Sequence, residues 1–266
     1  MLNIMHDKIL TIILQSLERI NYREIIKFGK ETVGKNISGD KTFRFDKIIE
    51  ESIVRNLRNL GFRGLIRGEE NPDYGGDIKE GVILIDPIDG SSNALRGIPY
   101  YATLIAYAER DSIESVTRAV VYAPELKEKY VAMLGEGAYL IKNNIIQRLM
   151  ITDAKSPVAL IEVLSAYSLQ FSREIFRFGK IRRLGSAGLA IVYTASNLLD
   201  AVMDIGRVMR MPDIAAPYLI LKEAGGEAII EPKKPLRADI RVNLLMGKPS
   251  LVRVLYRKFW TRRKRS

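Results

Sequence analysis

The sequence predicts a mixed α/β fold, because two kinds of hydrophobic pattern alternate along its 266 residues. Apolar side chains recur three or four residues apart in several segments, which is the spacing of one face of an amphipathic helix. Between them lie short apolar runs, such as the four consecutive aliphatic residues 82–85, that are typical of buried strands. Gly135 and Gly137 separate two strand patterns and indicate a hairpin, so we expect sheets that are not purely parallel.

The first sixty residues predict two helices. Ile9, Ile13 and Leu17 would share one face of the first helix. The second helix is expected over residues 44–60, and a glycine follows it as a stop signal. Residues 33–41, between the helices, are rich in glycine and polar side chains and are expected to form a mobile loop.

The middle of the chain predicts strands. Residues 81–86 should form a strand that is buried on both faces and ends at Pro87, because proline cannot donate to a central ladder. The other strands expected in this part are 101–108, 116–122, 129–134 and 138–141.

The second half alternates between strands and helices again. The expected strands are 158–164, 181–184, 201–205, 227–230 and 241–246. The expected helices are 172–178, 186–199, 212–224 and a last helix before the C-terminus. No linker separates domains convincingly, so we expect one domain over residues 1–256, with two α/β halves at about 1–150 and 151–256, and a basic tail over residues 257–266.

The residue types that are scarce restrict the chemistry. The chain has no cysteine, which excludes disulfides, cysteine-ligated zinc, iron–sulfur clusters and thiol nucleophiles. Its one histidine, His6, leaves little room for a Ser-His-Asp triad or a histidine-rich metal site. An enzyme with this composition must use carboxylates, hydroxyls, backbone groups and metals that prefer oxygen ligands.

The formal net charge of +11 would suit a nucleic-acid partner, but the charge is unevenly distributed. Residues 251–266 contain seven basic and no acidic side chains, and the rest of the chain carries only +4. We therefore favour a solvated basic terminus over one that binds RNA or an anionic lipid surface. No run approaches the ~20 apolar residues that span a bilayer, and no signal peptide is convincing, so we expect a cytoplasmic protein without a membrane partner.

The segment Asp-Pro-Ile-Asp-Gly-Ser-Ser-Asn, which starts at Asp86, is the most informative for function. Its turn follows a buried strand and can direct the carboxylates of Asp86 and Asp89 and the carbonyl of Ile88 at one point, which suits Mg²⁺. The amides of Gly90 and Ser91 would lie at a helix N-terminus, where phosphate is favoured. A metal site beside an anion site indicates phosphoryl chemistry.

Each part of this pattern also has a purely structural interpretation. Asp-Pro and Asp-Gly are common in turns, and Asp-Gly-Ser is an ordinary start of a helix. A calcium-binding EF-hand fits badly, because the alternate carboxylates before Gly90 and the loop-closing glutamate are absent. Taken alone, Glu69 and Glu70 would be a solvated surface, and Asp213 would only stabilise the first turn of a helix.

Taken together, these segments resemble the inositol monophosphatase family. The resemblance rests on three motifs in order: Gly-Glu-Glu at 68–70, the segment that starts at Asp86, and Asp-Ile-Ala-Ala at 213–216. It extends over nearly the whole chain, from the first helix to Gly226. It implies a layered α-β-α-β-α sandwich, a homodimer, and a Mg²⁺-dependent phosphomonoesterase whose substrate is a sugar or inositol phosphate.

The resemblance also implies roles for individual residues. The metal ligands would be Glu69, Asp86, the Ile88 carbonyl, Asp89, Asp213 and, in a looser site, Asp46. They would hold two or three Mg²⁺ ions, with Mn²⁺ as a substitute. The catalytic residues would be Glu69 together with Asp46 and Ser91, which would orient the attacking water. The substrate would contact Asp89, Gly90, Ser91, Arg182, Gly185, Ser186, Ala187, Asp204 and Asp213.

Three departures from the animal members favour the archaeal type, in which inositol-1-phosphatase and fructose-1,6-bisphosphatase activities share one site. Pro212 stands where animal members have Trp, the segment 206–212 is longer, and Thr42 lies four residues before Asp46 instead of three. Four arginines would supply charge for a second phosphate unless they are ordinary surface residues: Arg182, Arg183, Arg207 and Arg210.

Two alternatives stay open. A phosphatase of 3′-phosphoadenosine 5′-phosphate or of NADP would use the same fold. A nucleic-acid-binding protein that uses the basic tail would be of another class, and its binding would depend strongly on salt.

Overall fold

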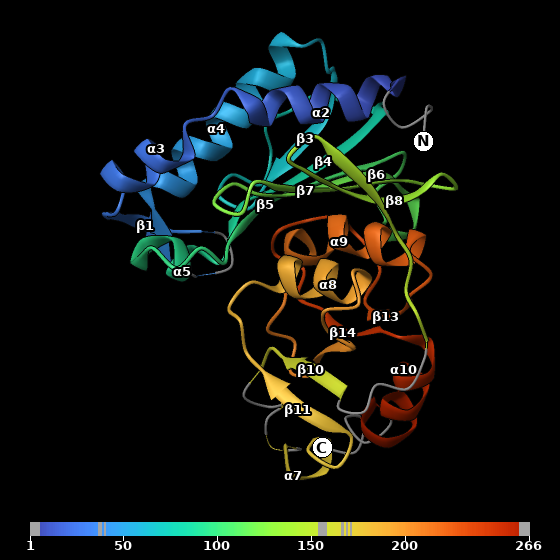
Figure 1. Ribbon diagram of the computed structural model, residues 1–266. Coiled ribbons are helices and arrows are strands. Elements are labelled where there is room, and N and C mark those ends of the chain that lie inside the picture. Colours follow the sequence, from blue (N-terminus) through green and yellow to red (C-terminus); the bar gives the residue numbers. More distant parts are fainter. Residues whose placement is uncertain are drawn as a thin grey trace.

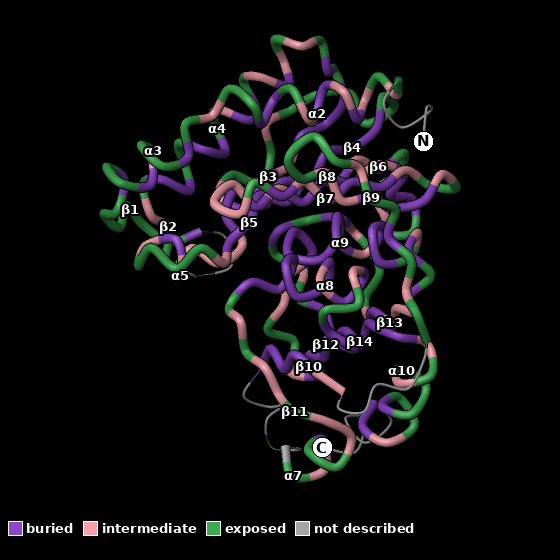
Figure 2. Tube along the Cα trace, viewed as in Figure 1, coloured by how far each residue is buried: buried purple, intermediate pink, exposed green. Residues whose placement is uncertain are grey.

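Five layers of secondary structure are stacked in the order helices, sheet, helices, sheet, helices (Figure 1). The computed structural model describes residues 6–36, 39, 41–153, 159–165, 168, 170 and 172–260. Buried residues concentrate in the sheet of the second layer and in the two helices of the third layer (Figure 2). Among the described residues, no helix is long and apolar enough to cross a membrane.

The first layer consists of helices α2 (Lys8–Glu18), α3 (Tyr22–Phe28) and α4 (Arg44–Asn59). Their apolar faces include Leu10, Leu17 and Ile53, which are fully buried. These side chains pack in one cluster with Ile83 and Ile105 of the neighbouring sheet. The helical spacing in the sequence therefore marks the face that contacts the sheet.

The second layer is a seven-stranded sheet whose strands follow the chain in order. Its strands are β3 (Gly64–Gly68), β4 (Asp77–Asp89), β5 (Ala102–Ala108), β6 (Val116–Ala123), β7 (Glu128–Met133), β8 (Gly137–Lys142) and β9 (Ile145–Leu149). Strands β3 and β4 are parallel, and every later pair is antiparallel.

Strand β4 continues beyond Pro87, so the prediction that proline ends it is wrong. The pairing with β5 shifts between Asp86, which faces Leu104, and Asp89, which faces Ala102. This irregularity takes Pro87 out of the regular ladder, where its missing N–H would matter. The carbonyl oxygen of Pro87 accepts a hydrogen bond from the Thr103 hydroxyl at 2.7 Å.

The third layer consists of helices α8 (Ala187–Ala195) and α9 (Met211–Glu223), which lie between the two sheets (Figure 1). Both are apolar on nearly all sides, as expected for helices with a sheet above and below. Their side chains share one core with the large sheet and with strands of the small sheet. Ser186 caps α8 by accepting the amide of Leu189, as the sequence predicts.

The fourth layer is a five-stranded mixed sheet in the order β11-β10-β12-β14-β13. Its strands are β10 (Ala159–Val163), β11 (Gly179–Arg182), β12 (Ala201–Asp204), β13 (Glu227–Glu231) and β14 (Asn243–Gly247). The short helix α7 (Ser172–Ile175), helix α10 (Pro249–Leu255) and the π-helical turn Tyr256–Trp260 follow in the last layer. Phe259 and Trp260 are buried against this sheet.

The mixed α/β class and the layered sandwich are confirmed, and the differences concern short elements. The sequence predicts a mobile loop over residues 33–41, but strands β1 (Thr32–Lys35) and β2 (Lys41–Phe43) pair at its two ends. Helix α3 and the exposed edge strand β9 have no predicted counterpart, because their apolar patterns are too short. Of the predicted basic tail, residues 261–266 lie outside the described residues.

The core between the large sheet and α8 should tolerate truncation poorly. Leu104 in β5 is 1% exposed, and its side chain lies against Gly188 of α8. We predict that Leu104→Ala lowers the free energy of unfolding by about 2–5 kcal/mol, measured by urea denaturation. Leu134, which is 56% exposed, is the matched control, and Leu134→Ala should change it by less than about 0.5 kcal/mol. Equal losses in the two variants would contradict the proposed packing.

Candidate active site

A cavity of about 480 Å³ opens where strands β3 and β4 end and helices α5 (Ser91–Arg96), α8 and α9 begin. Segments from both sheets and from the helices between them line it. Its lining residues are Lys41, Phe43, Glu69, Glu70, Asp86, Ile88, Asp89, Gly90, Ser91, Ser92, Glu162, Leu164, Arg183, Gly185, Ser186, Ala187, Val208, Met209, Arg210, Asp213 and Arg241.

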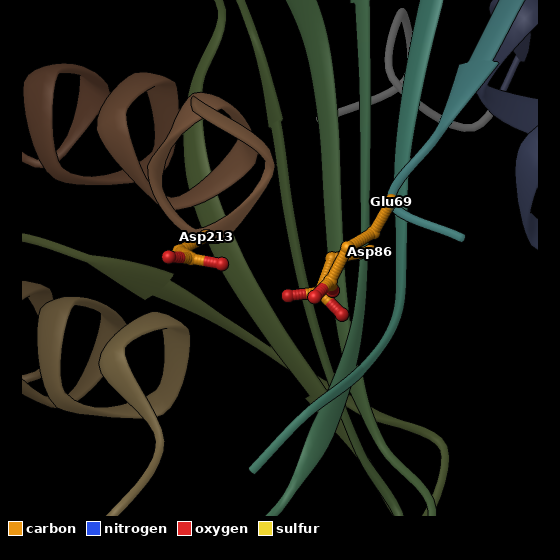
Figure 3. A group of neighbouring side chains, drawn as sticks. All are labelled: Glu69, Asp86 and Asp213. Carbon is orange, nitrogen blue, oxygen red and sulfur yellow. The ribbon is translucent and has the colours of Figure 1, made fainter. Parts of the chain in front are cut away.

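Three carboxylates meet in this cavity. Glu69 follows β3, Asp86 lies in the neighbouring strand β4, and Asp213 lies in the first turn of α9 (Figure 3). One oxygen from each carboxylate lies within 4.8 Å of the other two. The parallel pairing of Gly68 with Ile85 brings Glu69 beside Asp86, and the packing of α9 on the sheet supplies Asp213.

Gathering these charges away from water changes their protonation. Burial raises the pKa of Asp86 well above its ordinary value, and the negative charges of Glu69, Asp89 and Asp213 raise it further. Burial also raises the pKa of Glu69, although the Arg210 guanidinium opposes this. Ionised carboxylates at this separation require compensating cations.

The three carboxylates fit a hard divalent cation. They offer only oxygen atoms, which Mg²⁺, Ca²⁺ and Mn²⁺ prefer. Atom Oδ1 of Asp86 is buried and accepts no hydrogen bond from the described part of the chain, so it is available to a metal ion. Binding of a cation would also compensate the unfavourable free energy of burying the charged carboxylates of Glu69 and Asp213.

Asp89, a predicted metal ligand, is the last residue of β4, and its carboxylate lies at the N-terminus of α8. Its carboxylate accepts hydrogen bonds from the Ser186 hydroxyl at 2.6 Å and from the amides of Ala187 and Gly188 at 3.2 and 2.6 Å. Burial, followed by the charge of Asp213, raises the pKa of Asp89 to about 7. Asp89 therefore anchors α8 against the cavity, and it is outside the group of three carboxylates that approach within 4.8 Å.

Asp46 and Ser91 form a hydrogen-bonded pair. The Ser91 Oγ lies 2.8 Å from Oδ1 of Asp46 and 2.8 Å from the carbonyl oxygen of Ile88. The amide of Phe43 donates to the other oxygen of Asp46. Burial raises the pKa of Asp46 to about 8, and the nearby charge of Glu70 adds to this. Ser91 lines the cavity and connects Asp46 to it.

Two turns that the sequence assigns to substrate meet beside the carboxylates. Gly90 has a left-handed backbone, with φ of 95°, and precedes α5. A Cβ at this position would lie only 3.0 Å from the carbonyl oxygens of Gly185 and Tyr100, so glycine is required. The Asn93 amide donates to the carbonyls of Tyr100 and Leu184, which fixes the turn that carries Gly185.

Two predicted substrate contacts are not at the cavity. Asp204 is fully buried, and its carboxylate accepts the amides of Gly206, Val208 and Met209 at 2.8–2.9 Å. It thus holds the loop before α9 and is not among the residues that line the cavity. Arg182 ends β11 and donates to the carbonyl of Ile181; among the described residues that line the cavity, the neighbouring arginine is present and Arg182 is not.

The structure shows contacts of two residues that the motifs did not specify: Arg210 in the cavity lining and Glu50 behind it. Arg210 contacts Glu69 and Asp213, and its position three residues before Asp213 was the signal that could have indicated this. Glu50, one helical turn after Asp46, is fully buried. Its carboxylate accepts the amides of Glu70 and Asn71 at 3.0 and 2.8 Å and the Tyr74 hydroxyl at 2.9 Å. The lining residues outside the predicted motifs are Lys41, Phe43, Glu162, Leu164, Val208, Met209 and Arg241, and Arg183, one of the four arginines predicted for a second phosphate, also lines the cavity.

The layered fold and the acidic cavity beside α5 define a phosphatase of the metal-dependent sugar-phosphatase class. The comparisons with known proteins give the family. Residues 9–234 match the model of the inositol monophosphatase family, and the chain belongs to this family.

Three relatives illustrate the similarity. A fructose-1,6-bisphosphatase of Pyrococcus furiosus is 32% identical over 81% of this chain and 81% of its own. A bifunctional NADP phosphatase/NAD kinase of Methanococcus maripaludis is 27% identical over 83% of this chain, which covers 41% of that longer protein. A crystal structure of an inositol monophosphatase–fructose 1,6-bisphosphatase superposes with a TM-score of 0.76 at 27% identity, over 92% of this chain and 95% of its own.

The raised pKa values predict how stability depends on pH. Asp89, Asp46 and Glu50 have pKa values of about 7, 8 and 8 in the folded protein, against about 4 when unfolded. Between these values the folded state binds more protons than the unfolded state, so the free energy of unfolding falls as pH rises from about 4 to 8. We expect the Tm in EDTA to fall over this range. Saturating Mg²⁺ should reduce this decrease in Tm, because a cation favours ionised carboxylates. Tm curves that run parallel with and without Mg²⁺ would refute the assignment of the carboxylates to a metal site.

Glu50 should position Glu69 for metal binding. Glutamine has one acceptor oxygen where Glu50 uses two to hold the amides of the turn after Glu69. We predict that Glu50→Gln weakens Mn²⁺ binding about 10- to 100-fold, measured by calorimetry, while the circular dichroism spectrum is unchanged. Glu51→Gln, on the exposed face of the same helix, is the matched control and should bind Mn²⁺ as the wild type does. An unchanged affinity in Glu50→Gln would show that the turn needs no such support.

Proposed function

We propose that this protein is a Mg²⁺-dependent phosphomonoesterase that hydrolyses inositol monophosphate, fructose 1,6-bisphosphate or both, by means of a metal-activated water. The observation that carries the proposal is the meeting of Glu69, Asp86 and Asp213 beside the turn at Gly90, in a chain of the inositol monophosphatase family. The three carboxylates suit a divalent cation, and the turn at Gly90 suits a phosphoryl group. Metal-assisted hydrolysis of a phosphate ester needs both in one place.

The carboxylates of Glu69, Asp86 and Asp213 would hold Mg²⁺, with the Ile88 carbonyl and Asp89 completing the set and Asp46 contributing to a looser site. Bound Mg²⁺ supplies positive charge that makes a water molecule more acidic and stabilises charge on phosphoryl oxygens. Side chains of the protein would position the attacking water and the phosphate ester.

Ser91 and Asp46 would orient the attacking water. The Ser91 hydroxyl has one proton, so it can donate to only one of its two neighbours, Asp46 and the Ile88 carbonyl, both at 2.8 Å. Asp46 can accept a proton only when it is ionised. Burial raises its pKa to about 8, and a bound cation would favour the ionised form. Glu69 is the third proposed catalytic residue, and it lines the same cavity as Ser91.

The cations of the cavity favour a substrate with more than one phosphate. Lys41, Arg183, Arg210 and Arg241 line the same cavity as the carboxylates. Its volume of about 480 Å³ is within the usual range for small-molecule sites. Arginine binds phosphate oxygens in pairs, so Arg183 and Arg241 suit a second phosphate of fructose 1,6-bisphosphate. This substrate also appears in the name of the Pyrococcus furiosus relative.

NADP is a second candidate substrate, supported by the similarity to the bifunctional NADP phosphatase/NAD kinase. 3′-Phosphoadenosine 5′-phosphate belongs to the same group of hypotheses, because it also has a monoester phosphate and a second phosphate on the same nucleotide. Binding of nucleic acid by the basic tail is not favoured, and a homodimer in the cytoplasm remains the proposed state of the protein.

Asp86→Asn tests the function directly. Loss of this buried carboxylate should lower phosphate release from inositol-1-phosphate, fructose 1,6-bisphosphate and NADP, assayed in parallel with Mg²⁺, by more than about a hundredfold. EDTA should abolish release by the wild-type protein. Asp77→Asn, an exposed position, is the control and should retain full activity. Near-normal turnover in Asp86→Asn would refute the metal assignment, and release from NADP alone would favour the second candidate.

A further inference from the structure

Arg210 places a positive charge on the carboxylates that are proposed to bind metal. Its Nη2 lies 2.5 Å from Oε1 of Glu69 and 3.4 Å from Oδ1 of Asp213. The three side chains are 12%, 10% and 7% exposed, so solvent screens these contacts weakly. A guanidinium in this place occupies an oxygen atom of two of the three carboxylates that a divalent cation would need, and its single positive charge offsets part of their negative charge.

The backbone around Arg210 is held on both sides. The amide of Val242 donates to the carbonyl of Met209 at 2.8 Å, and the amide of Met211 donates to the carbonyl of Ile240 at 3.0 Å. The amide of Arg210 itself donates to Asp213. Because the backbone is held, the guanidinium would change partners by rotation about its own side-chain bonds, within the cavity that Arg210 lines.

A divalent cation and the guanidinium compete for the same oxygens. When a cation binds Glu69 and Asp213, their attraction for Arg210 weakens, and a buried guanidinium without a partner is unfavourable. It needs another anion within reach. The cavity offers one when a phosphoryl group lies at the turn of Gly90, and the planar guanidinium matches phosphate oxygens in pairs.

We propose that Arg210 exchanges anionic partners: it pairs with Glu69 and Asp213 until a divalent cation takes these carboxylates, and it then pairs with the phosphoryl group of the substrate. The second half rests on the proposed function, whereas the competition with metal does not. The exchange makes metal and phosphate binding strengthen one another, because each stabilises the position of Arg210 that the other requires.

The competition is tested by the affinity of the full chain for Mn²⁺ without substrate, measured by electron paramagnetic resonance. R210Q removes the competing charge, and we expect its Mn²⁺ affinity to rise about tenfold. R183Q removes the same charge from another part of the same cavity and should change the affinity by less than about threefold. An affinity in R210Q that is equal to or weaker than that of the wild type would overturn the proposal.

The exchange is tested by repeating the titration with saturating inorganic phosphate. In the wild type, phosphate should tighten Mn²⁺ binding by about tenfold, and in R210Q by at least about threefold less. Equal tightening in both would remove phosphate as the second partner. Should R210Q fail to fold, R210K keeps the charge but has no fork to bridge two carboxylates; its Mn²⁺ affinity should still exceed that of the wild type, and equality would overturn the proposal. None of these titrations needs turnover, so a failure of the phosphatase assay leaves their outcome readable.

Discussion

Burying several carboxylates within a few ångströms of one another is the constraint on which the site depends. Burial and mutual repulsion both favour the neutral acids, which explains the raised pKa values of Asp86, Glu69 and Asp89. Each group is stabilised by a different neighbour. Asp89 receives two amides and a hydroxyl at the start of α8, Glu69 receives Arg210, and Oδ1 of Asp86 remains for a cation.

Buried acids also hold the backbone that presents these groups. Glu50 ties the turn after Glu69 to α4 through two amides, and Asp204 ties the loop before α9 through three. Neither is in the cavity lining. Their hydrogen bonds fix backbone segments whose own amides would otherwise be unpaired in the interior. The cavity is therefore surrounded by a second set of carboxylates that act on structure.

The layered fold serves the site because elements distant in the sequence end at the same place. Two of the carboxylates come from the large sheet, at the end of β3 and in β4, and α9 supplies the third from the next layer (Figure 3). Glu162 of β10 and Arg183, directly after β11, line the same cavity from the small-sheet half of the fold. A site built from several layers can hold its groups rigidly, since each element is packed on two faces.

The sequence alone determined the mixed α/β class, most helices, and the motif residues that line the cavity. These follow from local patterns: helical spacing, short aliphatic runs, and a turn whose residue types suit metal and phosphate. It could not decide what each polar side chain contacts. By resemblance, Asp204 corresponds to a position that contacts substrate. Only the folded loop shows that its carboxylate oxygens accept hydrogen bonds from three backbone amides.

Only the tertiary structure decided the partners of Arg210, the role of Glu50, and the path of β4 past Pro87. Each depends on how a residue meets one that is distant in the chain, such as Arg210 with Glu69 or Pro87 with Thr103. Local patterns report which face of an element is apolar, but a hydrogen bond or ion pair depends on the relative placement of whole layers. That placement is set by packing of the complete core, to which no short motif has access.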